Sequence, residues 1–462
     1  MEAYSKLACQ SASCKVSVFR GTVLTEALCV FSVYIRAMSE PFPPNAPLRR
    51  VLLADCDQMF VAVARLVDPE GAGRAKLLVV GGRRGERGVV CSASYEVRAF
   101  GVRSGMPIAQ AERLCPEAVF APVPRRECGV KSREVYQVLQ EWAPVVEPAS
   151  IDEFYLGMDG TEALYRHEPL EQTAARIRED VLKRTGMSVS FGGGTNRLIA
   201  KLAVEYAKPK PGTGRTGVHV VLPGTEAEFV ATLELAAIPG IGPRFGELLR
   251  RKGLVRVTDA LDLERNVLEL WFGHRTGSWL YDRIRGISRS PVQGRGEAKS
   301  VSRENTFLTD LSTDDELKRE LVRLTARVCQ DLRGDGLIAR TVTIKLRDHD
   351  FRTRQASRTL DGYVSTERVI VPLALELLER LRKERRCPAR LIGIGLSQLA
   401  AADRPQQLGL FGEPEGRESE RDRRLSKTVD AITARFGRDS IVPARVVEDS
   451  RRQSKTDEAG RG

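Results

Sequence analysis

Two short apolar segments bordered by acidic residues constrain the fold of this chain more than any other feature. Arg50–Ala54 passes directly into Asp55-Cys56-Asp57, and Ile151–Leu156 carries Asp152 and Glu153 at its start. Both segments have the length of a β-strand. Acids beside apolar residues are costly to bury unless something neutralises them. The two acidic groups are therefore predicted to lie at strand ends.

Strand-like and helix-like patterns alternate around these two segments, from Arg50 to Ala207. The helical patterns are Met59–Leu66, Lys131–Trp142, Leu170–Thr185 and Asn196–Ala207, and the other strand-like runs are Leu77–Val80, Val89–Ser92 and Val189–Gly192. Such alternation predicts an α/β domain with a mixed sheet.

The pattern changes after Lys208-Pro209-Lys210-Pro211. It is mostly helical up to Arg285, with a Gly/Pro turn at Pro239–Pro243, and Gly286–Gly296 has the composition of an interdomain linker. Residues 297–400 then follow the order strand, helix, strand, strand, helix, strand: Ser302–Phe307, Asp315–Leu332, Ala339–Lys345, Ser357–Leu360, Pro372–Lys383 and Arg390–Leu399. We expect a second, smaller α/β domain there. A last amphipathic helix is predicted at Leu425–Phe436, with no role assigned to it.

The charge balance favours a polyanionic partner. The chain has 462 residues, with 73 Lys and Arg against 61 Asp and Glu, a net charge of +12. Cationic side chains that neutralise phosphates release condensed counterions, so nucleic acid is one candidate partner. A basic protein with no such partner is the alternative, because net charge does not determine fold.

Cysteine usage indicates a reducing compartment. The nine cysteines are scattered, odd in number and contain no C-x-x-C pair. A disulfide framework or a zinc finger is therefore not expected. We expect a cytoplasmic location instead. No apolar run approaches the roughly 18 residues that span a bilayer, so no membrane association is expected.

The first 37 residues form a poor signal peptide, because Val23–Ile35 is short and carries Glu26. Met38 opens a short polar leader before the first strand. We expect a disordered leader at 1–47 and translation from Met38, which an intact mass from the native host would test. A genuine disordered N-terminal tail is the alternative.

The acids at the strand ends could bind metal. Hard carboxylate oxygens suit Mg²⁺, and carboxylates converging from two strands could hold a pair of ions about 3.5–4 Å apart. Tyr95, Arg98 and Lys208 are candidate ligands of a triphosphate, Arg by its planar fork and Lys as a point charge. The alternatives are acidic strand ends that face water and solvated cations.

The turn Pro239-Gly240-Ile241-Gly242-Pro243 has the form of a helix-hairpin-helix. Its glycines allow close approach of the backbone, and free N–H groups at a helix start can bind a DNA phosphate. Arg244 and the neighbouring cations support this interpretation. The alternative is a plain helical connector.

Six motifs in order resemble those of Y-family translesion DNA polymerases of the DNA polymerase IV type, over about Arg50 to Leu399. They are LLADCDQMFVAV, CSASYEVRAFGVRSGMPIAQA, PASIDEFYL, FGGGTNRLIAKLAVEYAKPKP, LAAIPGIGPRFGELLRRKGL and KSVSRENTF. The resemblance implies an α/β (α+β) right-hand fold with a ferredoxin-like palm. The implied parts are a palm at 48–208 with fingers inserted at about 58–117, a helical thumb at 209–285, a basic linker at 286–296, a little finger at 297–402, and a flexible tail at 403–462.

The resemblance also implies roles for individual residues. The catalytic, metal-binding residues are Asp55, Asp152 and Glu153, joined by the backbone carbonyl of Cys56. Asp57 matches an acid that is frequent in the motif but is not a usual metal ligand. The nucleotide contacts are Ser92, Tyr95, Arg98, Lys208 and Phe60, the last as a steric gate against a 2′-hydroxyl. The DNA contacts are Gly240, Gly242, Arg244, Lys299 and Arg303.

The implied reaction is template-directed DNA synthesis past damaged bases. The primer 3′-hydroxyl attacks the α-phosphate of a dNTP with two Mg²⁺ ions, for which Mn²⁺ can substitute, and no proofreading exonuclease is expected. The implied partners are primer–template DNA, dNTPs and, through the pentapeptide Gln407, Leu408, Gly409, Leu410 and Phe411, the β sliding clamp. The alternative for this peptide is docking on its own chain. A monomer is expected.

Three positions depart from the family pattern. Gln58-Met59 replaces an aromatic pair that often precedes the gate, Ala64 replaces a common acid, and Gly192–Thr195 is unusually rich in glycine. They leave the fine specificity open but remove no catalytic group. A non-catalytic accessory factor with the same fold, recruited through the clamp, is an alternative function. A nucleotidyl cyclase is another, but it would leave the hairpin, the linker and the tail unexplained.

Overall fold

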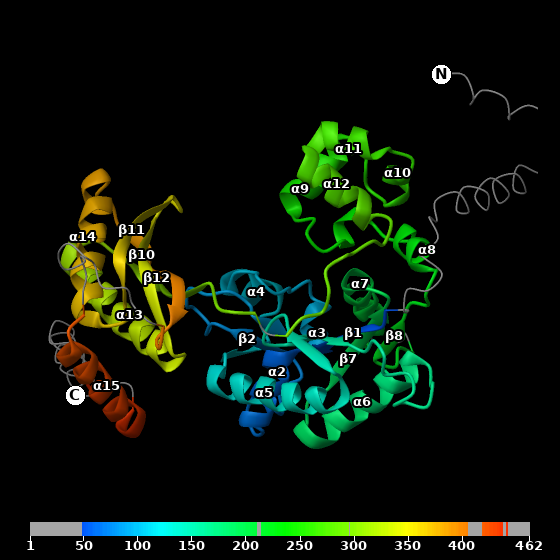
Figure 1. Cartoon of the computed structure of the whole chain (residues 1–462), viewed down its shortest axis with the longest axis horizontal. Helices are drawn as coiled ribbons and strands as arrows, with labels where there is room; N and C mark the ends of the chain where they lie inside the picture. The colour runs from blue at the N-terminus through cyan, green and yellow to red at the C-terminus, as the bar shows by residue number, and fades with distance from the viewer. Residues whose placement is uncertain (1–48, 210–213, 295, 405–417, 438–439, 442–462) are drawn as a thin grey trace, which may run out of the picture.

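The computed structural model describes residues 49–209, 214–294, 296–404, 418–437 and 440–441. The predicted leader at 1–47, with Met38, and the pentapeptide at 407–411 lie outside these residues. A sheet with helices on both faces forms the centre of the molecule, a helical body lies above it, and a second sheet with helices lies at one end (Figure 1). Among the described residues, no helix is both long and apolar enough to cross a membrane.

The central body is built on a five-stranded mixed sheet with the strand order β5-β6-β1-β7-β8. Only the β7–β8 pair is parallel. The strands are β1 (Val51–Cys56), β5 (Val145–Pro148), β6 (Glu153–Gly157), β7 (Val189–Gly194) and β8 (Val218–Val220). The predicted acidic segments thus form two neighbouring strands of one sheet.

Alternation along β1 assigns its side chains to two faces. Leu52, Ala54 and Cys56 pack with helices α5 (Arg125–Trp142) and α6 (Leu170–Thr185). Val51 and Leu53 pack instead with α7 (Arg197–Ala207) on the opposite face. Asp55 follows this second set, so its carboxylate faces α7.

A small sheet with the order β3-β2-β4 adjoins the central body. Its elements and the helices around it are α2 (Met59–Val67), β2 (Leu78–Gly81), β3 (Ser92–Ala93), α3 (Tyr95–Arg98), α4 (Ile108–Leu114) and β4 (Val119–Pro122). Val61 and Ala64 of α2 are buried against Leu78 and Val80 of β2. An acid at position 64 would therefore be desolvated, which explains why alanine fits there.

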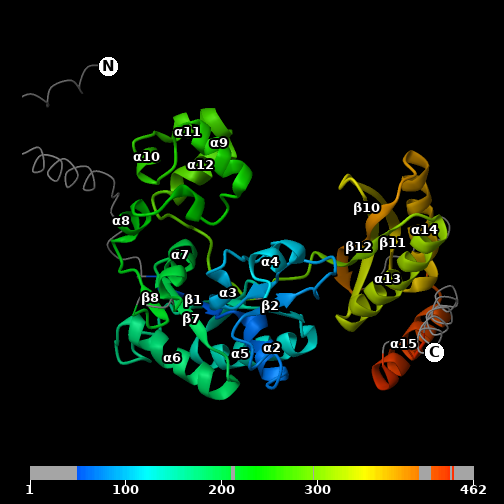
Figure 2. The same ribbon diagram turned by 180° about the vertical axis from the view of Figure 1, so that it is seen from behind.

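The apolar core of the helical body also includes Leu198, Ile199, Leu202 and Ala203 of α7. Its elements are α8 (Glu226–Ala231), the 3-10 helix η1 (Leu235–Ala237), α9 (Pro243–Arg251), α10 (Thr258–Leu261), α11 (Arg265–Phe272) and α12 (His274–Arg283). The chain leaves this body and crosses the central body on its way to the end sheet, as both views show (Figures 1 and 2). Val292 anchors the crossing segment by packing against Val51 and Tyr155.

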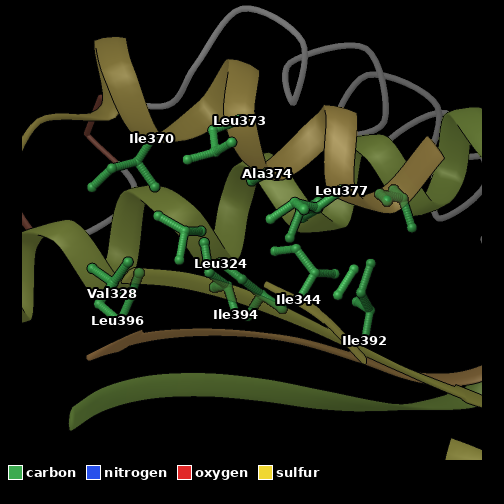
Figure 3. Packing of buried hydrophobic residues seen from close by; sticks show 14 of the residues in the cluster. Leu324, Val328, Ile344, Ile370, Leu373, Ala374, Leu377, Ile392, Ile394 and Leu396 are labelled. Atoms are coloured by element: carbon green, nitrogen blue, oxygen red, sulfur yellow. The ribbon is translucent and has the colours of Figure 1, made fainter. Parts of the chain in front are cut away.

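The end sheet has the order β11-β10-β12-β9 and is antiparallel throughout. Its elements are β9 (Ser300–Leu311), α13 (Asp314–Gly334), β10 (Leu337–Asp348), β11 (Thr353–Val364), α14 (Glu367–Glu384) and β12 (Ala389–Ala401). Both helices cover one face, where Leu324, Ile344, Leu377 and Ile394 interdigitate (Figure 3). The predicted order of elements is confirmed, although each strand is longer than predicted.

A final helix, α15 (Glu420–Phe436), lies beside the helical layer of the end sheet (Figures 1 and 2). Ser419 caps it in a reciprocal arrangement with Asp422. The sequence predicted this helix only from Leu425, because its first turn is strongly charged and lacks apolar periodicity.

Candidate active site

The acids of the two strand-like segments meet across a strand pair. Asp55 of β1 lies directly opposite Glu153 of β6 in the antiparallel register. Phe154 and Leu156 point to the α5–α6 side, whereas Tyr155 packs on the α7 side. Because alternate residues share a face, Glu153 lies on the α7 side together with Asp55.

Two lysines of the α7 segment neutralise this pair. The ammonium of Lys208 lies 2.9 Å from an Asp55 carboxylate oxygen, and Lys201 forms an ion pair with Glu153. Burial raises the pKa of Asp55 to about 6, against the lowering influence of Lys208. Although burial lowers the pKa of Lys208, its pairing with Asp55 and with Glu205 raises it above the ordinary value overall.

Asp152 lies just outside β6 and faces a different partner. Its carboxylate accepts a hydrogen bond from the Ser150 hydroxyl, and its backbone carbonyl accepts the N–H of Cys56 at 2.9 Å. Burial, together with Asp152, Asp55 and Asp57, raises the pKa of the Cys56 thiol well above its usual value. The thiol itself faces the core, so a backbone carbonyl is the only Cys56 group suited to a hard cation.

The acids are not gathered into one cluster. Over the described ranges, no three His, Cys, Asp or Glu side chains lie close enough to hold a metal ion. Asp55 is turned to Lys208, Glu153 to Lys201 and Asp152 to Ser150. The donors still fit Mg²⁺ in chemistry, because carboxylate oxygens from adjacent strands lie at one edge of the sheet.

Asp57 is held by two serines that sequence reasoning did not find. The hydroxyls of Ser188 and Ser190 each donate to its carboxylate at 2.7 Å, and its N–H donates to the Ser188 carbonyl at 2.9 Å. This clip fastens the end of β1 to β7. The serines are far away in the sequence and carry no motif, so only the sheet register reveals them.

The small sheet contributes the residues expected at a triphosphate. Ser92 is buried at the start of β3, and Tyr95 begins α3. Burial raises the pKa of Tyr95, Asp57 raises it further, and Arg98 and Lys208 lower it. The Arg98 guanidinium lies 5.1 Å from the centre of the Tyr95 ring. The charges that act on Tyr95 thus come from both the central body and the region of the small sheet.

Phe60 bridges the two bodies in the first turn of α2. Its half-buried ring packs against both the core of the central body and the cluster between α2 and β2. The preceding Met59 is 2% exposed and belongs to the core of the central body. Gln58 adopts the left-handed conformation with φ 49° before α2 begins. Met59 is therefore part of the apolar core of the central body.

The glycine-rich β7 is explained by close helix packing. A Cβ on Gly192 would lie 2.2 Å from the Ala200 carbonyl oxygen and from the Val204 nitrogen. Only glycine fits this close contact between β7 and α7. The contact brings α7, with Lys201 and Lys208, close to the acidic edge of the sheet.

The helix-hairpin-helix residues are exposed at the start of α9. Gly240 has φ +104°, and a Cβ there would lie 2.7 Å from the Trp279 ring. Gly242 precedes Pro243, the first residue of α9, and Arg244 is exposed. Lys299 is exposed at the start of β9, whereas Arg303 donates to Asp331 of α13 at 2.6 Å. Arg303 thus lies on the helical side of the end sheet.

Comparisons with known proteins agree with this architecture. Residues 54–205 match the model of the impB/mucB/samB family, and residues 298–410 match the C-terminal domain of the same family. A solved Y-family DNA polymerase chimera of Dbh and Dpo4 is similar with a TM-score of 0.66 and 24% identity, covering 76% of this chain and 99% of the other. The fold is therefore that of Y-family DNA polymerases, and the predicted α/β right-hand class is confirmed.

Curated relatives narrow the assignment. The DNA polymerase IV of Desulfatibacillum aliphaticivorans is 35% identical over 399 residues, 86% of this chain and 97% of the relative. That of Halorhodospira halophila is 36% identical over 360 residues, 78% of this chain and 98% of the relative. The chain belongs to the DNA polymerase IV family and is a DNA-directed DNA polymerase. The resemblance of the six motifs is thereby confirmed.

Proposed function

We propose that this polymerase copies DNA past damaged template bases by metal-assisted nucleotidyl transfer and carries no proofreading exonuclease. The observation that supports it most is the opposition of Asp55 and Glu153 on the α7 face of the palm sheet, with Lys208 at 2.9 Å from Asp55. Acids and cations at one sheet edge are the combination that phosphoryl transfer requires, because catalysis there depends on positioning and charge neutralisation.

Asp55, Asp152, Glu153 and the Cys56 carbonyl are the proposed ligands of two Mg²⁺ ions, for which Mn²⁺ can substitute. The chemistry that such ions supply is activation of the attacking oxygen and stabilisation of the leaving one. Lys201 forms an ion pair with Glu153 and so holds its carboxylate on the α7 face. The serine clip on Asp57 fixes the end of β1, so the backbone between Asp55 and Asp57 is held in place.

Lys208 is proposed to change partners during the reaction. Its ammonium is bound to Asp55 and Glu205. A point charge on a flexible stem can turn toward an incoming triphosphate, whereas the Arg98 fork offers paired donors. Arg98 and Tyr95 from α3, with Ser92 beside them, would surround the phosphates from the side of the small sheet. Phe60, which packs against both clusters, is proposed to exclude a 2′-hydroxyl.

The remaining parts are proposed to hold the primer–template. The predicted division is kept as part of this proposal: a palm at 48–208 with its fingers, a thumb at 209–285, a linker at 286–296 and a little finger at 297–402. The exposed hairpin of Gly240, Gly242 and Arg244 supports phosphate contacts without base readout. Lys299 is exposed and available for the same purpose. Arg303 would first have to release Asp331 to contact DNA.

Primer extension tests the reaction. Wild type is compared with Asp152→Ala/Glu153→Ala on a plain template and on one carrying a damaged base, with Mg²⁺ and dNTPs. We expect extension of both templates by the wild type only. Glu179→Ala, an exposed acid of α6, is the matched control and should extend normally. If neither protein extends a primer that both bind, a non-catalytic accessory function replaces this proposal.

We further propose that Gln407–Phe411, in the tail at 403–462, binds a sliding clamp. Apolar residues in a polar segment gain free energy by burial in a partner's groove. Deletion of these residues should abolish stimulation by the clamp and leave unassisted extension intact. Loss of both activities would instead show that the deletion damages the fold, whereas unchanged stimulation by the clamp would refute a dedicated clamp peptide.

A further inference from the structure

The helix α15 attaches to the little finger with its polar side. Ser426 and Thr433 lie two helical turns apart, and both are buried. Leu425 and Phe436 of the same helix are 63% and 66% exposed. In the described part of the chain, none of the apolar clusters includes a residue of α15. This attachment differs from that of α13 and α14, which pack on the sheet with apolar side chains.

The first attachment centres on Arg333 in the last turn of α13. Its guanidinium donates to both carboxylate oxygens of Asp430, at 2.7 and 2.8 Å. The same side chain donates to Glu367 at 2.9 Å and to the Ser365 carbonyl at 2.7 Å. The Ser426 hydroxyl donates to Glu367 at 2.9 Å. One arginine thus joins the end of α13, the start of α14 and the middle of α15.

The second attachment is the fully buried carboxylate of Glu418, just before α15. It accepts the backbone N–H groups of Ser365 and Thr366, where α14 begins. Thr366 makes no side-chain cap hydrogen bond of its own. An anion is favoured at a helix N-terminus, where N–H groups lack intrahelical partners. Glu418 therefore caps α14 from outside that helix.

The apolar side of α15 is left incomplete by this docking. Leu425, Val429, Ile432 and Phe436 follow helical spacing and form one stripe. Val429 and Ile432 are half-buried at the edge of the docked face, whereas Leu425 and Phe436 are open to solvent. Undocking would expose the whole stripe, and it would return Glu418 and Asp430 to water.

We propose that Glu418–Phe436 is a reversible latch, closed on the little finger by the charges of Glu418, Arg333 and Asp430. Its open state presents a complete amphipathic helix and uncaps α14. Polar groups exchange protein partners for water at little net cost, whereas the apolar core has no such substitute. The latch therefore opens far more readily than the core. The pentapeptide at 407–411 lies outside the described residues and carries no part of this proposal.

Hydrogen exchange of the full chain tests the latch. In the wild type, we expect amides of α15, Ser365 and Thr366 to exchange at least tenfold faster than those of β10 and β12. Glu418→Gln/Asp430→Asn should speed exchange of the first group by a further tenfold or more and leave β10 and β12 unchanged. Glu420→Gln, which removes an exposed pair with Arg424, is the matched control and should change neither group.

Three outcomes overturn the proposal. Equal protection of α15 and the strands in the wild type would make the helix part of the cooperative core. Unchanged α15 exchange in Glu418→Gln/Asp430→Asn would show that these charges do not hold it. Exchange of β10 and β12 serves as the internal measure of folding, and a rise there equal to that in α15 also refutes a separate latch. Unassisted primer extension should be unaffected by the double substitution.

Discussion

Two buried aspartates, Asp55 in the palm and Asp348 in the little finger, show how differently one side chain is used in this molecule. Asp55 is 6% exposed and has the ammonium of Lys208 at 2.9 Å. Asp348 is completely buried, but two guanidinia surround it. Arg354 donates to its two oxygens at 2.9 and 3.3 Å, and Arg385 donates at 2.9 Å.

The difference separates a structural acid from an acid of the proposed site. Asp348 has its charge balanced by planar donors that match a carboxylate geometrically. Asp55 has one flexible point charge and a nearby carboxylate, Glu153, and its pKa rises to about 6 because burial dominates. A group left under-neutralised by its fold is suited to accept a cation that arrives later. Perturbed acids of this kind concentrate at functional sites.

The largest expected effect is the loss of catalysis in Asp55→Asn. Removing one carboxylate from a proposed metal pair should lower primer extension about 10³-fold or more, because several kcal/mol of charge stabilisation are lost. Single-turnover extension measures it. Asp361→Asn, an exposed acid of β11, is the control and should retain full activity. Retention of activity by Asp55→Asn would place the metal elsewhere.

Asp348→Ala should show the reverse pattern. It leaves two guanidinia without their shared buried anion, so the free energy of unfolding should fall by about 3–5 kcal/mol. Urea unfolding of the little-finger transition measures the loss, with Asp361→Ala as the control. If Asp348→Ala lost catalysis but kept its stability, Asp348 would not be a structural acid and the contrast with Asp55 would be wrong.

A pair of phenylalanines extends the contrast. Phe60→Ala should raise incorporation of ribonucleotides relative to deoxyribonucleotides by roughly 10–100-fold, because a steric exclusion worth about 1–3 kcal/mol is removed. Phe307→Ala should leave this ratio unchanged and lower stability instead, since its ring belongs to the little-finger core. Competing rNTP and dNTP incorporation gives the ratio. Unchanged discrimination in Phe60→Ala would show that the gate is assigned wrongly.

Lys208→Met should raise the KM for dNTP about tenfold, because one charge contact with the triphosphate is lost. The same change removes the main cation that lowers the pKa of Asp55. That pKa should rise further, and the acid limb of the pH–rate profile should move to higher pH. Lys183→Met, an exposed lysine of α6, is the control. A kcat loss without any change in KM or in the pH profile contradicts the partner exchange.

The last expected effect is on the pH dependence of stability. The folded protein binds a proton at Asp55 more tightly than the unfolded chain does, because its pKa is about 6 against 3.8. As the pH rises from about 4 to about 6, the unfolding free energy of the wild type should therefore fall relative to that of Asp55→Asn, by at most about 3 kcal/mol. Urea unfolding across this range measures it. The prediction is contradicted if the stability of the wild type minus that of Asp55→Asn stays constant or increases as the pH rises through this range.

Local patterns allowed much of the fold to be predicted. The helix Leu170–Thr185 was predicted with its observed bounds, because its amphipathic spacing and the following Gly186 are encoded within the segment. The edges of the end-sheet strands were not, because their last residues pair with neighbours from distant parts of the chain. The acids at the ends of β1 and β6 were found for the same local reason that the helices were.

The sequence by itself determined the order of elements, the acids at the strand ends, the glycines of the hairpin and the family. Only the tertiary structure decided that Asp55 faces Glu153, that Lys201 and Lys208 neutralise them, that Ser188 and Ser190 hold Asp57, and that α15 docks by its polar side. Periodicity and turn chemistry act over a few residues and can therefore be recognised in the amino-acid sequence. The pairing of charges between remote elements depends on sheet register and helix packing, which are fixed only when the whole core closes.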